Sequence, residues 1–147
     1  MNIKLFLVVI LIAGFAVTDS QAGQATNELG VCLTDSLNGK ERKALARWIF
    51  FAIAAHPEMS PYSRISETSR DNSHQLVGTL VTRLMTEDCP VRTKAAVQKS
   101  GSAAIESAFS LVGQVAMQEL MNNQDVTTSI SGFEKYLDKE KLNALGL

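Results

Sequence analysis

The sequence has little of the side-chain chemistry that builds metal centres and catalytic sites. Its 147 residues include only two histidines and two cysteines, and they contain neither a Gly-x-Ser-x-Gly motif nor a phosphate-binding glycine loop. A calcium loop built around Gly39 would require acidic side chains where Thr34 and Leu45 stand, so we reject that site. We therefore predict no catalytic residue, no metal ion and no cofactor, and we expect a protein that is not an enzyme.

The sequence also lacks an excess of charge of either sign. Its formal net charge is −1 at pH 7, from 14 basic and 15 acidic side chains. Electrostatic binding to nucleic acid or to an anionic membrane requires a clear basic excess. We therefore expect neither of them as a partner.

Residues 1–22 have the organisation of a cleavable secretory signal peptide. Lys4 supplies a positive charge, residues 5–17 form an uncharged and mostly apolar run, and polar residues follow. The small residues after this run predict cleavage before Gly23, with a cut after Ala25 as the alternative. An uncleaved N-terminal anchor is the other interpretation, although a membrane span needs about 20 apolar residues.

The compartment follows from the same segment. A bacterial lipoprotein signal would have a cysteine where Phe15 stands, so we expect no lipid anchor. No second apolar run in residues 23–147 is long enough to span a bilayer, which predicts no stable membrane insertion after cleavage. The prediction is an exported protein, periplasmic or secreted, whose oligomeric state the sequence does not assign.

The cysteine pair predicts a disulfide bond. Cys32 and Cys89 are the only cysteines, and an even number in an exported chain is typical of a bridge. Closing this 57-residue separation would stabilise the fold by about 4 kcal/mol on the chain-entropy model. The alternative is two free thiols, one of them a nucleophile.

The apolar pattern predicts helices and no strands. Sustained alternation with a period of two is missing, whereas apolar residues recur at helical spacing. Residues 23–147 are the size of one domain, and we predict a single compact all-α bundle of four to six helices with one disulfide.

The predicted central helix begins after Asn38 and ends near residue 55, before Pro57. Asn38 and Glu41 have the spacing of a capping box, and the helix interior is apolar nearly all round. A helix of this kind is expected to be surrounded by others. Its predicted core side chains are Trp48, Ile49, Phe51 and Ile53. A short helix near residues 26–36 would place Cys32 against the domain.

The remaining predicted elements follow from breaks in the pattern. Residues 60–75 are polar and predicted to be mainly an exposed loop; a helix over about 69–88 ends at Cys89-Pro90. Residues 90–122 are helical, with a break expected near Gly101. Residues 127–131 are expected to be a loop, and 132–145 a last amphipathic helix broken near Asp138. Its candidate anchors are Phe133, Tyr136, Leu137, Leu142 and Leu145.

One cluster conflicts with the helix dipole. Lys40, Arg42, Lys43 and Arg47 place positive charge in the first half of the central helix, where acidic side chains are favoured. The functional interpretation is a basic patch that binds an acidic partner or an anionic ligand. The alternative is a solvated helix end whose charge Glu28, Asp35 and Glu41 offset. Arg47 is expected to pair with a carboxylate or to stack on an aromatic ring.

The two histidines give only a weak polar site. His56 and Glu58 flank Pro57 and could form an acid–base or metal pair, but no third ligand lies near them in sequence. The structural alternative is that His56 caps the last carbonyls of its helix. His74 lies beside an apolar stripe and is expected at the boundary of the core.

These observations favour a non-enzymatic exported protein that binds another exported or envelope protein, for assembly, stress response or inhibition and immunity. A second hypothesis is a carrier of an apolar small ligand between helices, with Trp48, Phe50, Phe51 and Phe109 as candidate lining residues. The third is an uncharacterised enzyme around His56 and Glu58.

Overall fold

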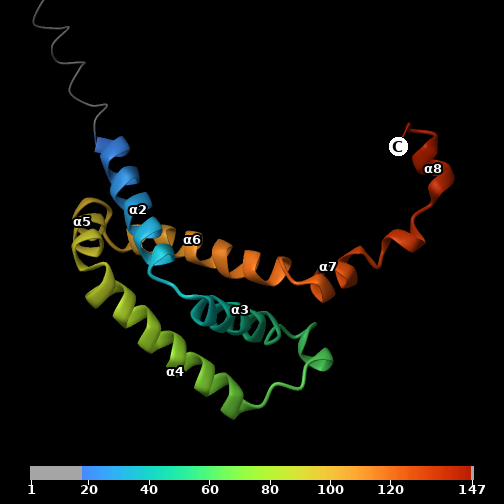
Figure 1. Cartoon of the computed structure of the whole chain (residues 1–147), viewed down its shortest axis with the longest axis horizontal. Helices are drawn as coiled ribbons and strands as arrows, with labels where there is room; N and C mark the ends of the chain where they lie inside the picture. Colours follow the sequence, from blue (N-terminus) through green and yellow to red (C-terminus); the bar gives the residue numbers. More distant parts are fainter. Residues whose placement is uncertain (1–17, 147) are drawn as a thin grey trace, which may run out of the picture.

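The computed structural model describes residues 18–146, which form seven α-helices and three shorter helical segments without a strand (Figure 1). The α-helices are α2 (Thr18–Asp35), α3 (Gly39–Ile53), α4 (Glu67–Arg83), α5 (Pro90–Ser100), α6 (Ser102–Met121), α7 (Gln124–Ser131) and α8 (Lys139–Asn143). The shorter segments are η1 (Ser60–Tyr62), the π-helical η2 (Leu84–Asp88) and η3 (Glu134–Tyr136).

The predicted fold class is confirmed: the described chain is an all-α bundle with one disulfide. The helix count exceeds the predicted four to six by one, because residues expected to be a loop form α7. Most of the predicted signal peptide, including Lys4 and Phe15, lies outside the described residues. Both predicted cleavage points, before Gly23 and after Ala25, fall within α2, and cleavage stays a prediction.

The Cys32–Cys89 disulfide joins α2 to the junction between η2 and α5, with the two Cα atoms 6.1 Å apart. The predicted pairing is confirmed, and the described chain has no free cysteine. Leu29 and Leu33 lie on the same helix and are fully buried. Because α2 packs against both α5 and α6, its apolar face and the disulfide hold these three helices together.

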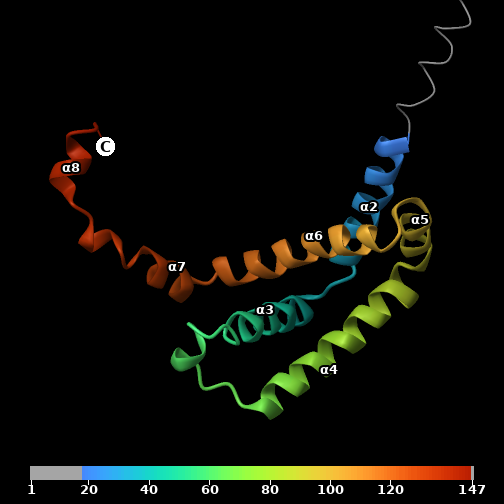
Figure 2. The same cartoon turned by 180° about the vertical axis from the view of Figure 1, so that it is seen from behind.

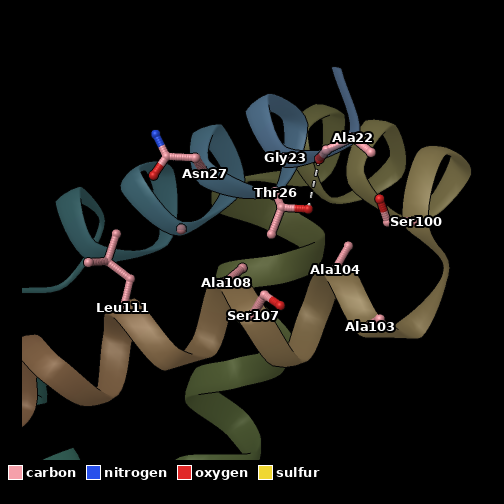
Figure 3. Close-up of a pocket in the computed structure, with 11 residues that line it drawn as sticks. Ala22, Gly23, Thr26, Asn27, Ser100, Ala103, Ala104, Ser107, Ala108 and Leu111 are labelled. Atoms are coloured by element: carbon pink, nitrogen blue, oxygen red, sulfur yellow. Dashed lines mark hydrogen bonds between the residues drawn. The ribbon is translucent and has the colours of Figure 1, made fainter. Parts of the chain in front are cut away.

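The helices α2 and α6 approach each other closely through small side chains (Figure 3). A Cβ atom added to Gly30 would lie 3.2 Å from the Leu111 side chain and 3.4 Å from the Ala108 carbonyl. Ala104 and Ala108 are buried on the facing side of α6. The close packing therefore depends on the absence of a side chain at position 30.

The helix α3 begins with the predicted capping box. The Asn38 side chain accepts a hydrogen bond from the backbone of Glu41, and the Glu41 carboxylate accepts one from the backbone of Asn38. The prediction that α3 is surrounded is wrong, because its main neighbours are the two helices α4 and α6 (Figure 1). Its outer side is open, and the predicted core residue Ile53 is 53% exposed.

The core of α3 consists of smaller side chains than predicted. Ala44, Leu45 and Ala46 are buried, whereas Trp48 and Ile49 are partly buried at the edge of the core. Phe51 is also only partly buried. With two neighbours rather than a full ring, the helix can bury only one part of its apolar surface.

The helix α4 begins close to the start predicted near residue 69. Ser66 caps it by accepting a hydrogen bond from the backbone of Ser69, so the helix begins at Glu67. Val77 and Leu80 of α4 and Leu84 of η2 are buried along one side of this helical run. The chain leaves this helical run at Cys89-Pro90, as predicted, after the π-helical turn η2.

The predicted break near Gly101 is confirmed and separates α5 from α6. Gly101 has φ = 61° and ψ = −150°, a backbone conformation that residues other than glycine rarely adopt. This glycine lets α6 leave α5 at a sharp angle and pack beneath α2.

The C-terminal arm (residues 124–146) leads away from the body formed by α2–α6, and both views show it (Figures 1 and 2). The predicted loop over 127–131 is wrong, because Asn123 accepts hydrogen bonds from the backbones of Asp125 and Val126 and so starts α7. This cap overrides the weak helix propensity of the Thr- and Ser-rich segment.

The predicted last helix is present only as η3 and α8, separated near Asp138. The prediction that its apolar side chains anchor it is wrong: Tyr136 is 80% exposed, and only Leu142 is partly buried. The other exposed members are Phe133, Leu137 and Leu145. Lys141 hydrogen-bonds Asp138 and lowers the pKa of its carboxyl group, which caps α8.

Removal of the disulfide should strongly destabilise the body. We expect the double variant Cys32→Ser/Cys89→Ser to lose about 4 kcal/mol of unfolding free energy, because its unfolded chain is no longer cross-linked. Urea unfolding of both proteins measures the difference. Treating the parent with a reductant is the control and should reproduce the loss; equal stability of variant and oxidised parent would contradict the prediction.

A branched side chain at position 30 should push α2 away from α6. We expect Gly30→Val to destabilise the protein by about 1–3 kcal/mol through overpacking. Gly78→Val is the matched control, because a Cβ added at Gly78 of α4 meets nothing within 4 Å. Thermal unfolding should show a lower midpoint for Gly30→Val alone, and an equal change in both variants would count against the close-packing interpretation.

Candidate functional site

A groove of about 1130 Å³ runs between α3 and α4. Four cationic side chains line it: Lys40, Lys43 and Arg47 from α3, and Arg83 from α4. Glu41 is the only acidic side chain among the lining residues. The groove therefore combines a large open volume with a local excess of positive charge.

Helical spacing explains why these cations share one face. Positions 40, 43 and 47 are three and four residues apart, so their side chains lie along the same side of α3. On α4, Gln75, Thr79 and Arg83 recur at intervals of four and face the same groove. The two helices thus contribute complementary walls, with Ala44 and Leu80 as buried apolar side chains between them.

Arg83 is the structural cation of the groove. Its guanidinium lies 2.9 Å from the Glu41 carboxylate and 2.8 Å from that of Asp88. Because Glu41 also belongs to the capping box, this ion pair ties the start of α3 to the end of α4. The one carboxylate of the groove is therefore already engaged.

Two other cations of the groove, Lys40 and Arg47, are free to bind an anionic group from outside the chain. Within residues 18–146, Lys40 and Arg47 take part in no ion pair, and both are exposed. The predicted pairing of Arg47 with a carboxylate or an aromatic ring is not found among residues 18–146, where Arg47 instead lines the groove. Two unpaired cations thus stand about two turns apart along one helix.

The basic cluster is divided between two surfaces. Arg42 donates a hydrogen bond to the Leu37 carbonyl and lies 3.8 Å from the Glu119 carboxylate of α6. The Lys43 ammonium is 3.9 Å from the same carboxylate, although Lys43 also lines the groove. Arg42 is therefore mainly a structural contact between α3 and α6.

The acidic side chains expected to offset this cluster have other roles. Glu28 forms an ion pair with Arg92, and Glu41 pairs with Arg83. Glu119, which the sequence did not single out, is the carboxylate that contacts the cluster. Within residues 18–146, none of Glu28, Asp35 and Glu41 forms an ion pair with the four cations of the cluster.

The polar pair at the end of α3 forms a local turn. His56 accepts a hydrogen bond through Nδ1 from the backbone N–H of Glu58, at 3.2 Å, and both side chains are exposed. Its side chain thus bonds the following turn and not the helix carbonyls that we expected. Among the described residues, no group of three His, Cys, Asp or Glu side chains could hold a metal ion.

His74 joins α4 to the aromatic edge of the core. Its Nδ1 atom accepts a hydrogen bond from the indole N–H of Trp48, at 3.1 Å. His74 is exposed and Trp48 is partly buried, which agrees with the predicted boundary position. This bond fixes the orientation of the only tryptophan in the chain.

Two further hollows lie in the body. A cavity of about 340 Å³ between α3, α4 and α6 is lined by apolar residues, among them Trp48 and Phe109. The expectation that Phe50 and Phe51 would also line it is wrong, because neither is among its lining residues. A groove of about 380 Å³ between α2 and α6 is lined mainly by small side chains (Figure 3).

Comparison with known proteins found no matching family model, no similar curated protein and no similar solved structure. Within residues 18–146, none of the helices combines the length and the apolar character that crossing a membrane requires. Any function of this protein therefore has to be inferred from its own side chains.

The role of Arg83 should be visible in stability at low salt. We expect Arg83→Met, which keeps the aliphatic stem, to lose about 1 kcal/mol because two partly exposed ion pairs disappear. The loss should shrink at high salt. Urea unfolding at both salt concentrations measures it, with Lys94→Met as a control, because Lys94 is exposed and forms no ion pair within residues 18–146. A loss of the same size in both variants would show that the ion pairs contribute nothing.

Proposed function

We propose that this is an exported, non-enzymatic protein that binds an acidic segment of another exported or envelope protein in the groove between α3 and α4. The observation that carries the proposal is the charge of that groove. Lys40, Lys43, Arg47 and Arg83 line it, and its one carboxylate is already paired with Arg83. An acidic occupant would supply the missing negative charge.

The size of the groove favours a protein segment over a small molecule. Ligand pockets usually enclose about 300–1,000 Å³, and this open groove has about 1130 Å³. Leu76 is 41% exposed at its wall and offers an apolar contact between the charged side chains. A helix or extended segment with acidic and apolar residues would match both features.

The charge arrangement favours fast and specific association. Lys40 and Arg47 form no ion pair within the described chain, so a partner carboxylate does not have to displace an internal one. Cations that line a cleft raise the local concentration of an anionic partner and accelerate its encounter. Such binding weakens as salt increases.

Export is the cellular part of the proposal. The disulfide is compatible with an oxidising compartment, and the predicted signal peptide provides the route. Cleavage before Gly23 would remove the first five residues of α2 and leave the buried Leu29, Leu33 and the disulfide in place. The groove lies on α3 and α4 and is untouched by either predicted cut.

The groove can be tested with a synthetic amphipathic peptide of glutamate and leucine. We expect saturable binding that weakens with salt, and Lys40→Glu/Arg47→Glu should lower the affinity by about tenfold or more, since attraction becomes repulsion. Fluorescence anisotropy of the labelled peptide measures this. Lys94→Glu/Lys99→Glu is the matched control, because it changes the net charge equally on the exposed surface of α5.

The natural partner can be sought with a photo-crosslinking residue at Gln75 in the groove and, as a control, at the exposed Gln98 of α5. A crosslinked envelope protein that depends on Gln75 and is lost in Lys40→Glu/Arg47→Glu would support the proposal. Equal weakening of peptide binding by the α5 control variant would contradict it, because binding would then follow net charge alone.

A further inference from the structure

We propose that the cavity between α3, α4 and α6 is a binding site for one uncharged, largely apolar small molecule. This inference is independent of the groove between α3 and α4. It depends on the shape of the body: α3 packs against both α4 and α6, whereas α4 and α6 are not a packed pair and diverge in both views (Figures 1 and 2). The space between them is the cavity of about 340 Å³.

The chemistry of the walls selects the ligand class. Leu45 and Trp48 come from α3, Val77 and Val81 from α4, and Phe109 and Gly113 from α6. None of the lining residues is charged, and their one polar hydrogen, on the Trp48 indole, is donated to His74. A charged ligand would lose its hydration there without compensation, so the occupant must be apolar where it is buried.

The volume selects the ligand size. An enclosed apolar cavity of about 150 Å³ can hold one benzene molecule, and this hollow is roughly twice as large and is open to solvent on one side. Two linked aromatic rings or an alkyl chain of medium length would fill it. Water that enters from the open side finds apolar walls, so an apolar ligand that displaces it removes apolar surface from water.

Gly113 shows that the wall has unfilled space. It lies on α6 and lines the cavity, yet a Cβ atom added to it would meet nothing within 4 Å. A glycine inside a helix is less favourable than alanine, and packing gives no reason for it here. Because Gly113 has no side chain, this part of the wall stays open.

Ligand binding in the cavity can be tested with N-phenyl-1-naphthylamine, an uncharged fluorescent probe in which a naphthalene and a phenyl ring are joined through an amine nitrogen. We expect one molecule to bind per protein and to quench Trp48, which is the only tryptophan and lies in the wall. The sulfonated analogue, 8-anilinonaphthalene-1-sulfonate, should displace the probe about tenfold less effectively or worse, because its charge has no partner in the cavity.

A pair of glycine variants locates the binding site. Gly113→Leu should fill the cavity and lower the probe affinity by about tenfold or more, while folding is retained because the space is open. Gly78→Leu is the matched control: Gly78 also lies inside a helix, a Cβ there meets nothing within 4 Å, and it does not line the cavity. Circular dichroism and thermal unfolding check that both variants fold.

The outcomes separate the possibilities. Saturable binding that Gly113→Leu abolishes and Gly78→Leu preserves would support the site, and Lys40→Glu/Arg47→Glu should leave it unchanged. Absence of saturable binding to the parent protein, which is expected if the helices close the space or a partner's side chain fills it, would overturn the proposal. Equal affinity in the parent and in Gly113→Leu, or equal displacement by the sulfonated analogue, would also overturn it.

Discussion

The Cys32–Cys89 bond is the constraint on which the arrangement of the body depends. It fixes α2 to the point where the chain passes from η2 into α5, and α2 in turn packs against α5 and α6. The far ends of α4 and α6 are not tied in this way, and α3 fills only part of the space between them. Three helices therefore pack together beside the disulfide, whereas the groove and the apolar cavity both have walls on α3 and α4.

Local sequence signals predicted where helices begin and end better than they predicted which side chains the neighbouring helices bury. Three helix boundaries were predictable, because residues adjacent in the sequence determine them. They are the capping box of Asn38 and Glu41, the stop at Cys89-Pro90 and the break at Gly101. The exposure of Ile53 was not predictable, because periodicity identifies an apolar face but not whether another helix covers that face. The same reason explains the exposed side chains of the C-terminal arm. The helix α7 was missed because Asn123 compensates for weak helix formers.

The candidate site was predictable only on one of its two walls. Lys40, Lys43 and Arg47 share a helix, so their spacing could be read directly. Arg83 lies on α4, and only the fold brings it beside Glu41. The apolar cavity was expected from aromatic residues, but its walls require three helices with a gap between two of them. Trp48 and Phe109 were identified, whereas Phe50 faces the open side of α3.

The C-terminal arm gives the molecule two separate levels of cooperativity. Within the described chain, α7 packs mainly against α6, and α8 packs extensively against no other element. Segments with few tertiary contacts open without unfolding the rest, at a free-energy cost far below that of global unfolding. Amide hydrogens of the arm should therefore exchange with solvent long before those of α2 and α6. A denaturation curve that follows total helix content would combine the gradual loss of the arm with one sharp transition of the body.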